Sequence, residues 1–156
     1  MRLEYFEMID RVEAFDQKRG HIEAISKVPE RSPIFEGHFP HFPVMPGVLL
    51  LETMNHAAGY VMLGLNGWSR MPFFAGVKRI KIKRFVTPGM LMHVTADLLH
   101  SGSGFCVCQG EIRIDGEQVA EAEITLMQMK YPSAELNEMV KHRARLIGIV
   151  LEETAA

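Results

Sequence analysis

Residues 35–64, FEGHFPHFPVMPGVLLLETMNHAAGYVMLG, constrain the fold of this chain more than any other stretch. The first part carries three prolines, the last of them Pro46, among Phe, Gly and His residues. Because proline fixes φ and removes an amide donor, this part forms neither a regular helix nor a central strand. The second part, from Gly47 to Gly64, is an almost unbroken apolar run with Glu52 as its only acid. Burying a lone carboxylate is costly, so Glu52 points to a function.

The apolar run predicts a helix that begins near Pro46, whose missing amide is no loss in a first turn, and ends before Gly67. Apolar residues cover almost the whole circumference, so we expect the helix to be buried on all sides. The run is long enough to suggest a membrane span. Glu52, Asn55 and His56 at its centre favour instead a buried helix of a soluble protein, and we predict no membrane span.

The rest of the chain reads mainly as strands. Alternating segments predict a hairpin from about residue 6 to residue 28 and further strands at 73–86, 91–100, 105–114 and 119–130. A C-terminal helix follows Pro132, with Ser133 as its N-cap and an apolar stripe that runs from Leu136 to Leu151. A hairpin, one apolar helix and a series of antiparallel strands predict an α+β fold, in which a strongly curved antiparallel sheet wraps round the central helix.

Composition sets the broad class of protein. A chain of 156 residues is most simply one globular domain, and a formal net charge of −2 gives no global indication of nucleic acid or an anionic membrane as partner. Cys106 and Cys108 would share one face of a strand, where we interpret them as reduced residues of a cytosolic protein. The N-terminus lacks the apolar region of a secretory signal. We therefore expect a cytoplasmic location.

His38 and Glu52 are the candidate catalytic pair. His38 lies in the proline-stiffened loop and Glu52 on the helix that follows it, which suggests a base and an acid in an apolar crevice. Desolvation there would raise the pKa of the carboxyl group. The alternative is that Glu52 forms a structural pair with His56, one helical turn later. Gly47 either presents a first-turn amide that polarises a substrate carbonyl or merely permits close packing.

Two further side-chain groups have less specific readings. His38, His41, Glu52 and His56 have the ligand types of a zinc or iron site, but lone histidines are usually not ligands, and we predict no metal. A basic group on the strand that follows the helix would either dock an acidic partner or form a solvated strand face; it consists of Lys78, Arg79, Lys81, Lys83 and Arg84. No aromatic residues interleave with these cations, as a single-stranded nucleic-acid platform would require, and we predict no nucleic-acid partner.

The segment GHFPHFPVMPGVLLLETMNHAAG resembles the active-site segment of the hot-dog-fold 3-hydroxyacyl-acyl carrier protein dehydratases of bacterial fatty-acid synthesis, the FabZ-like enzymes. The family motif GHFPxxPxxPGVLxxExM carries the catalytic His and, fourteen residues later, the catalytic Glu. His38 and Glu52 match in identity and spacing, and Gly47 matches the glycine whose amide binds the thioester carbonyl. The resemblance continues through residues 73–89 and 115–126.

The resemblance implies a hydro-lyase that needs no cofactor. Its substrate would be a (3R)-hydroxyacyl thioester on the phosphopantetheine arm of an acyl carrier protein, and its product a trans-2-enoyl thioester. The substrate-binding residues implied are Phe39, Val48, His56 and Phe74, and the acyl tunnel would end at Met54, Tyr60, Met62 or Phe74. The five cations of the basic group would dock the acidic carrier. The family forms a homodimer or a trimer of dimers, in which each site takes its His and its Glu from different subunits.

The chain departs from the family pattern at several positions. His56 stands where the family has a Gln that holds the Glu side chain, and Met90 replaces an Asp after Pro88 and Gly89. The helix after Pro132 lies outside the family core, so we divide the chain into a dehydratase domain at 1–131 and a helical extension at 132–156. This extension suggests a branch that acts on long acyl chains for an envelope lipid. The alternative functions are a hot-dog acyl thioesterase and a non-catalytic acyl-carrier-binding subunit.

Overall fold

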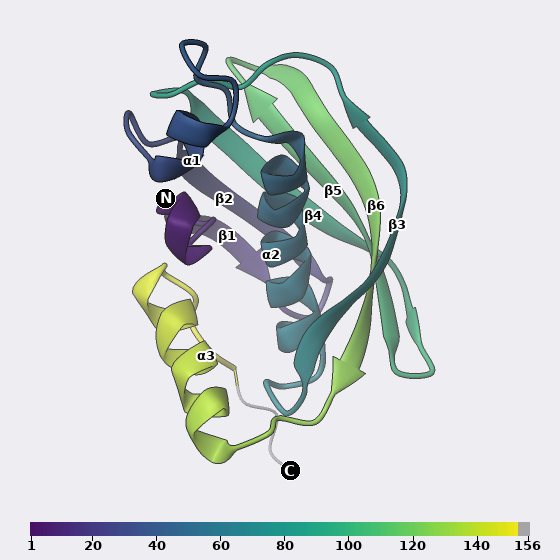
Figure 1. Cartoon of the computed structure of the whole chain (residues 1–156). Coiled ribbons are helices and arrows are strands. Elements are labelled where there is room, and N and C mark those ends of the chain that lie inside the picture. Colours follow the sequence, from purple (N-terminus) through teal and green to yellow (C-terminus); the bar gives the residue numbers. More distant parts are fainter. Residues whose placement is uncertain (153–156) are drawn as a thin grey trace.

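A computed structural model describes residues 1–152 and shows one antiparallel sheet curved round a central helix (Figure 1). The strands are β1 (Arg11–Asp16), β2 (His21–Lys27), β3 (Met71–Ile82), β4 (Leu91–Gly102), β5 (Phe105–Ile114) and β6 (Glu117–Met129). The helices are α1 (Pro33–Gly37), α2 (Gly47–Leu65) and α3 (Ala134–Leu146), and a short 3-10 helix spans Leu3–Tyr5. The sheet order is β1-β2-β4-β5-β6-β3, with every neighbouring pair antiparallel. The predicted α+β architecture is confirmed.

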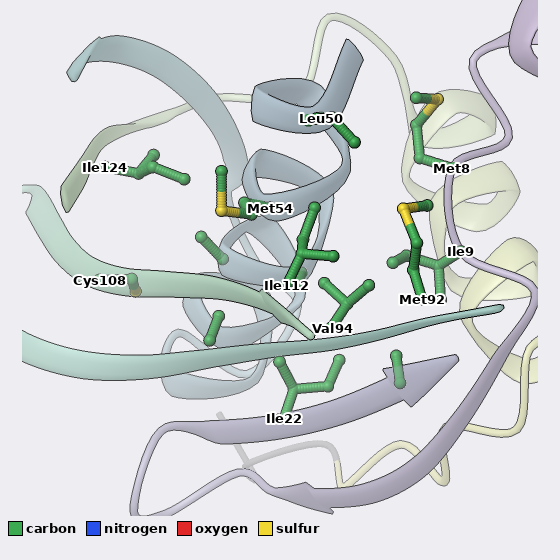
Figure 2. Close-up of a cluster of buried hydrophobic side chains, with 14 of the residues drawn as sticks. Met8, Ile9, Ile22, Leu50, Met54, Met92, Val94, Cys108, Ile112 and Ile124 are labelled. Carbon is green, nitrogen blue, oxygen red and sulfur yellow. The ribbon is translucent and has the colours of Figure 1, made fainter. Parts of the chain in front are cut away.

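The core lies between α2 and the concave face of the sheet (Figure 2). Buried and accessible residues alternate along β5, as expected for a strand with one face on the core. Figure 2 shows Leu50 and Met54 of α2 in one cluster with Ile112 and Ile124 of the sheet, and all four are almost completely buried. Each such side chain contributes about 1.5–3 kcal/mol to the free energy of unfolding.

The predicted strands are confirmed, but the hairpin begins with β1 at Arg11 rather than near residue 6, and two details of the loops differ. β3 ends at Ile82, not at residue 86. Val86 instead contacts the loop that precedes α2, where its carbonyl accepts a hydrogen bond from the Met45 amide at 2.7 Å. The short helix α1 was not predicted. Ser32 caps it by accepting a hydrogen bond from the Ile34 amide. A helix of five residues is too short to show a hydrophobic period in the sequence.

The prediction that α2 is buried on all sides is wrong. The helix is long and apolar enough to cross a membrane, but 61% of its apolar window is buried inside the protein, as in a core helix. Its sheet-facing residues are buried, whereas Val48 is 73% exposed and Glu52, His56 and Tyr60 are half-buried. The sheet covers only one side of the helix, so a second face remains free to form a site.

The C-terminal helix begins as predicted and ends earlier. Ser133 caps α3 by accepting from the Leu136 amide, and the helix stops at Leu146, so Leu151 does not belong to its stripe. Figure 1 shows α3 beside the lower half of α2. Ala144 at its end, and Ile147 and Ile149 after it, are buried members of the main core cluster. The extension therefore shares the core of the fold.

Candidate functional site

The loop that carries His38 is held in an unusual backbone conformation. His38 follows α1, and its amide donates to the Ile34 carbonyl at 3.0 Å. Phe39 and His41 both have positive φ, 52° and 71°, which costs side-chain-bearing residues about 1–3 kcal/mol each. The Phe39 ring packs edge-on against the His38 ring, with centroids 4.6 Å apart. Such local strain is typical of functional loops.

Gly47 is the first residue of α2, directly after its N-cap Pro46. The Pro46 carbonyl accepts from the Leu49 and Leu50 amides, while the Gly47 amide belongs to the first turn, whose donors have no partner within a helix. A Cβ atom at Gly47 would lie 2.8 Å from Ile82 Cδ1 at the end of β3. Gly47 therefore has a first-turn amide that could bind a substrate carbonyl, and it also allows β3 to approach closely. Both roles considered for Gly47 keep a physical basis.

Glu52 is held by two donors from its own helix. His56 Nε2 lies 2.9 Å from Glu52 Oε1, and Asn55 Nδ2 donates to Glu52 Oε2 at 3.0 Å. Both Glu52 and His56 side chains are about 30% exposed, at 29% and 30%. Burial raises the pKa of Glu52, but the hydrogen bond and charge of His56 and the Asn55 amide lower it more, so the pKa lies below its ordinary value. The expectation that desolvation dominates is wrong for this geometry.

A cavity of about 310 Å³ begins at Glu52 and follows one face of α2. The α2 residues that line it recur every three or four positions, namely Glu52, Asn55, His56, Gly59, Tyr60 and Leu63. Its other walls come from β3, the end of the sheet and α3, through residues that include Pro72, Phe74, Leu126 and Tyr131. Most of these side chains are apolar or aromatic, and the carboxyl, amide and imidazole groups gather at the Glu52 end. This arrangement suits an apolar ligand with a polar head.

The structure brings some of the predicted site residues together and separates others. Of the predicted substrate-binding residues, His56 and Phe74 line the cavity with Glu52, whereas Phe39 and Val48 are 60% and 73% exposed and do not line it. His38 also lies outside this cavity.

The candidates for the end of the tunnel divide in the same way. Tyr60 and Phe74 line the cavity, while Met54 and Met62 are completely buried in the core cluster. Asn55 was not identified from the sequence as a hydrogen-bond donor to Glu52. A polar residue three positions after the acid in an apolar helix was a signal that could have indicated it. Tyr131 was not identified either, because nothing in the local sequence places that residue beside α2.

The three histidines and one glutamate considered as a metal set do not come together as a site. Within residues 1–152, no group of three or more His, Cys, Asp or Glu side chains is arranged to hold a metal ion. The pairing of Glu52 with His56 is the part of that set which the structure brings into contact.

The basic group on and after β3 is largely paired with acids of β6. The ion pairs are Arg79–Glu123 at 2.6 Å, Lys81–Glu121 at 3.6 Å and Arg84–Glu117 at 2.9 Å, and Lys83 donates to Gln118. Lys78 makes no ion pair with residues 1–152. The β6 glutamates therefore offset much of the positive charge, and Lys78 is the cation most available to an acidic partner.

Similar solved structures share the architecture. A conserved protein of Pseudomonas aeruginosa superposes with a TM-score of 0.64 at 23% identity, covering 80% of this chain and 93% of that one. A hypothetical thioesterase of Streptococcus pneumoniae with coenzyme A gives a TM-score of 0.60 at 17% identity, covering 79% of this chain and 90% of that one. At these identities the likeness shows the hot-dog fold alone.

Sequence comparison reaches further than the fold. A family model described as the FabA-like domain matches residues 2–123. The 3-hydroxyacyl-[acyl-carrier-protein] dehydratase FabZ of Shewanella woodyi is 40% identical over 123 residues, covering 76% of this chain and 80% of the relative. The FabZ of Streptococcus pyogenes serotype M3 is 35% identical over 119 residues, covering 76% of this chain and 84% of the relative. The chain therefore belongs to the FabA-like family of hot-dog proteins, among relatives that are FabZ dehydratases.

Proposed function

We propose that this protein is a 3-hydroxyacyl-acyl carrier protein dehydratase, a hydro-lyase of fatty-acid biosynthesis. The observation that carries the proposal is Glu52, a carboxyl group held by two side chains at the polar end of an otherwise apolar cavity. The membership of the FabA-like family and the FabZ relatives support the same reaction. The substrate is a (3R)-hydroxyacyl group carried as a thioester on acyl carrier protein.

The reaction removes water across C2 and C3 of the acyl group. His38, as the base, takes the C2 proton, and the Gly47 amide stabilises the negative charge that develops on the thioester oxygen. Glu52 gives a proton to the 3-hydroxyl group, which leaves as water, and the electrons of the C2–H bond form the double bond of the trans-2-enoyl product. Because His56 Nε2 lies 2.9 Å from Glu52 Oε1, the two side chains can share the proton that Glu52 delivers.

Two copies of the chain build each site in this proposal. His38 does not line the cavity that contains Glu52, so a single copy does not enclose both groups there. The side chains beside the His38 loop and the start of α2 form an exposed apolar surface, consisting of Phe39, Phe42, Val48 and Phe85. A second copy that covers this surface would add its own His38 to the Glu52 cavity. Sedimentation equilibrium at micromolar concentration tests the dimer or trimer of dimers; a monomer with full activity would contradict it.

Several finer assignments stay predictions. Lys78, the least paired cation of the basic group, is our first candidate for carrier docking, and Lys78→Glu should raise the KM for acyl carrier protein with little change in kcat. The cytoplasmic location is tested by cell fractionation. The division at residue 131 separates the family core from the extension, although α3 packs into the same hydrophobic core. A role in an envelope lipid would require that loss of the protein changes the acyl chains of that lipid.

The decisive experiment incubates the protein with 3-hydroxyacyl carrier protein and follows the product by mass. We expect loss of one water to give the enoyl carrier, with no free thiol; thiol release would indicate a thioesterase instead, and binding without turnover a non-catalytic subunit. Glu52→Gln and His38→Ala should each lower kcat by about 10²–10⁴-fold. Full activity in either variant would refute the assignment.

His56 is a positioning residue in this scheme, because it acts through Glu52. His56→Gln keeps a side-chain donor one turn after Glu52 and should retain most of kcat, whereas His56→Ala removes it and should lower kcat more than it raises KM. A pH profile distinguishes this role from a merely structural one. The alkaline limb of kcat should move to higher pH in His56→Gln, because loss of the His56 charge raises the pKa of Glu52. An unchanged limb would show that His56 has no part in proton delivery.

A further inference from the structure

The cavity at Glu52 has the dimensions of a tube for one extended chain. From Glu52 to Leu63 it follows eleven residues of α2, a rise of about 16 Å at 1.5 Å per residue. A volume of about 310 Å³ spread over that length gives a tube about 5 Å across, similar to the ~4.7–4.9 Å between neighbouring extended chains in a sheet. The polar end at Glu52 and the apolar remainder match an acyl group whose 3-hydroxyl meets Glu52.

The far end of this tube is formed by the C-terminal segment. Trp68, just after α2, donates its amide to the Leu63 carbonyl at 2.8 Å, and its own carbonyl accepts from Asn137 Nδ2 at 2.8 Å. The start of α3 is therefore tied to the end of α2, opposite to Glu52. Leu136, beside Asn137, and Val140, one turn later, both line the tube. Tyr131 lines it as well, and its hydroxyl is buried without a hydrogen bond of normal geometry.

Tyr131 also borders a second, open cleft. This cleft lies beyond the tube and is lined by Trp68, Arg70, Tyr131 and Asn137, among others. Because Tyr131 belongs to both linings, it lies at the boundary between the tube and this cleft. Removing the ring would connect the two spaces.

The wall formed by α3 is fixed in place at both ends. In addition to the Asn137 contact, the Val12 amide donates to the Ile147 carbonyl at 2.7 Å, and Arg143 Nη2 donates to the Ile9 carbonyl at 3.4 Å. Ile147 is 3% exposed, so the helix end is embedded in the core. The family match ends at residue 123, so this wall belongs to the part of the chain that the family model does not cover.

We propose that Tyr131, Leu136 and Val140 are the specificity-determining residues that set the longest acyl chain this site accepts, with Tyr131 as the end of the tube. The inference rests on the proposed function. Because the tube is about 16 Å long, it accepts an acyl chain whose extended length beyond the carbon that Glu52 addresses is no more than about 16 Å. Chains that exceed this length meet the ring of Tyr131.

The test compares variants across a series of 3-hydroxyacyl carrier proteins of increasing length, with enoyl products measured by mass. Val140→Phe fills the tube and should lower the ratio of kcat/KM for long over short chains by about tenfold or more. Tyr131→Ala opens the tube into the cleft and should raise that ratio for chains beyond the wild-type limit. Met139→Phe is the matched control, since Met139 is 66% exposed on the neighbouring face of α3 and lines no part of the tube; its profile should equal that of the wild type.

A binding measurement keeps this inference separate from the proposed function. In the Glu52→Gln background, the Kd of each hydroxyacyl carrier is measured without turnover, alone and with Val140→Phe or Tyr131→Ala. Absence of dehydration at every length in the wild type would refute the proposed function, while a length-dependent Kd that shifts with the α3 variants would still support the tube. If Val140→Phe does not fold, Tyr131→Ala decides. A length profile equal to the wild type in a folded, active Tyr131→Ala or Val140→Phe overturns the inference.

Discussion

Replacing Glu52 by Gln tests whether burial or hydrogen bonding has the larger effect on the stability of this carboxyl group. The substitution preserves shape and removes the charge, and therefore removes two opposing effects at once. Burial destabilises the ionised carboxylate, whereas the hydrogen bonds from His56 and Asn55 and the charge of His56 stabilise it. The lowered pKa of Glu52 means that the favourable interactions exceed the cost of burial.

The expected change in the free energy of unfolding follows from how exposed Glu52 and His56 are. A hydrogen bond to a charged group contributes about 1.5–3 kcal/mol when buried, and an exposed ion pair four residues apart on a helix about 0.3–0.5 kcal/mol. Glu52 and His56 are 29% and 30% exposed, and Gln can still accept one of the two hydrogen bonds. We therefore expect Glu52→Gln to lower the free energy of unfolding at pH 7 by about 0.5–1 kcal/mol, or a Tm decrease of a few degrees at most.

The stabilisation that Glu52 provides depends on pH. A carboxyl group with a lowered folded-state pKa stabilises the protein above its unfolded-state pKa, and that contribution disappears as the pH falls through the folded-state value. The difference between wild type and Glu52→Gln should therefore be largest near neutral pH and vanish in acid. Urea denaturation at a series of pH values and one fixed protein concentration measures it, with Glu36→Gln as the exposed control. A Glu52→Gln protein that is more stable than the wild type at pH 7 would refute the reasoning, because it would show that desolvation dominates.

Three further substitutions test the packing of the fold, and the last of them also tests the cavity. Ser26→Ala removes a fully buried hydroxyl that donates to a backbone carbonyl at 2.6 Å, and should lower the free energy of unfolding by about 1–3 kcal/mol in urea; a neutral result would mean that water replaces it. Gly20→Ala should lower the free energy of unfolding, measured in urea, by more than the ~1–2 kcal/mol expected for a left-handed residue with a side chain. The φ of Gly20 is +73°, and the new Cβ would also lie 2.7 Å from Leu98 Cβ. Gly59→Ala should raise the Tm slightly, since its Cβ meets Pro72 at 3.4 Å and α2 loses a helix-interior glycine, yet lower kcat/KM for long acyl chains by narrowing the tube; an unchanged length profile would contradict the course of the tube.

The candidate site shows where sequence reasoning stops. The residue types and spacing of His38, Gly47 and Glu52 were sufficient to place them in one family motif, because catalytic groups on a loop and a helix start keep a fixed separation along the chain. The surroundings of Glu52 were not readable in the same way. Asn55 and His56 both contact it, and their joint effect on its pKa depends on distances of about 3 Å that only the folded helix defines.

The sequence by itself determined the class of fold and the secondary structure, apart from the short helix α1 and the ends of β3 and α3. Alternation along the strands and an apolar run bounded by proline and glycine are local patterns. Such patterns can be read without knowing which other segments of the chain pack against them. Tertiary structure alone decided which face of α2 remains uncovered, because that depends on how far the sheet curves. It also decided that Tyr131 and Val140, more than sixty residues after the helix, form the end of the tube that begins at Glu52. A segment outside the family motif thus becomes part of the candidate site through packing, which no periodicity in its own sequence encodes.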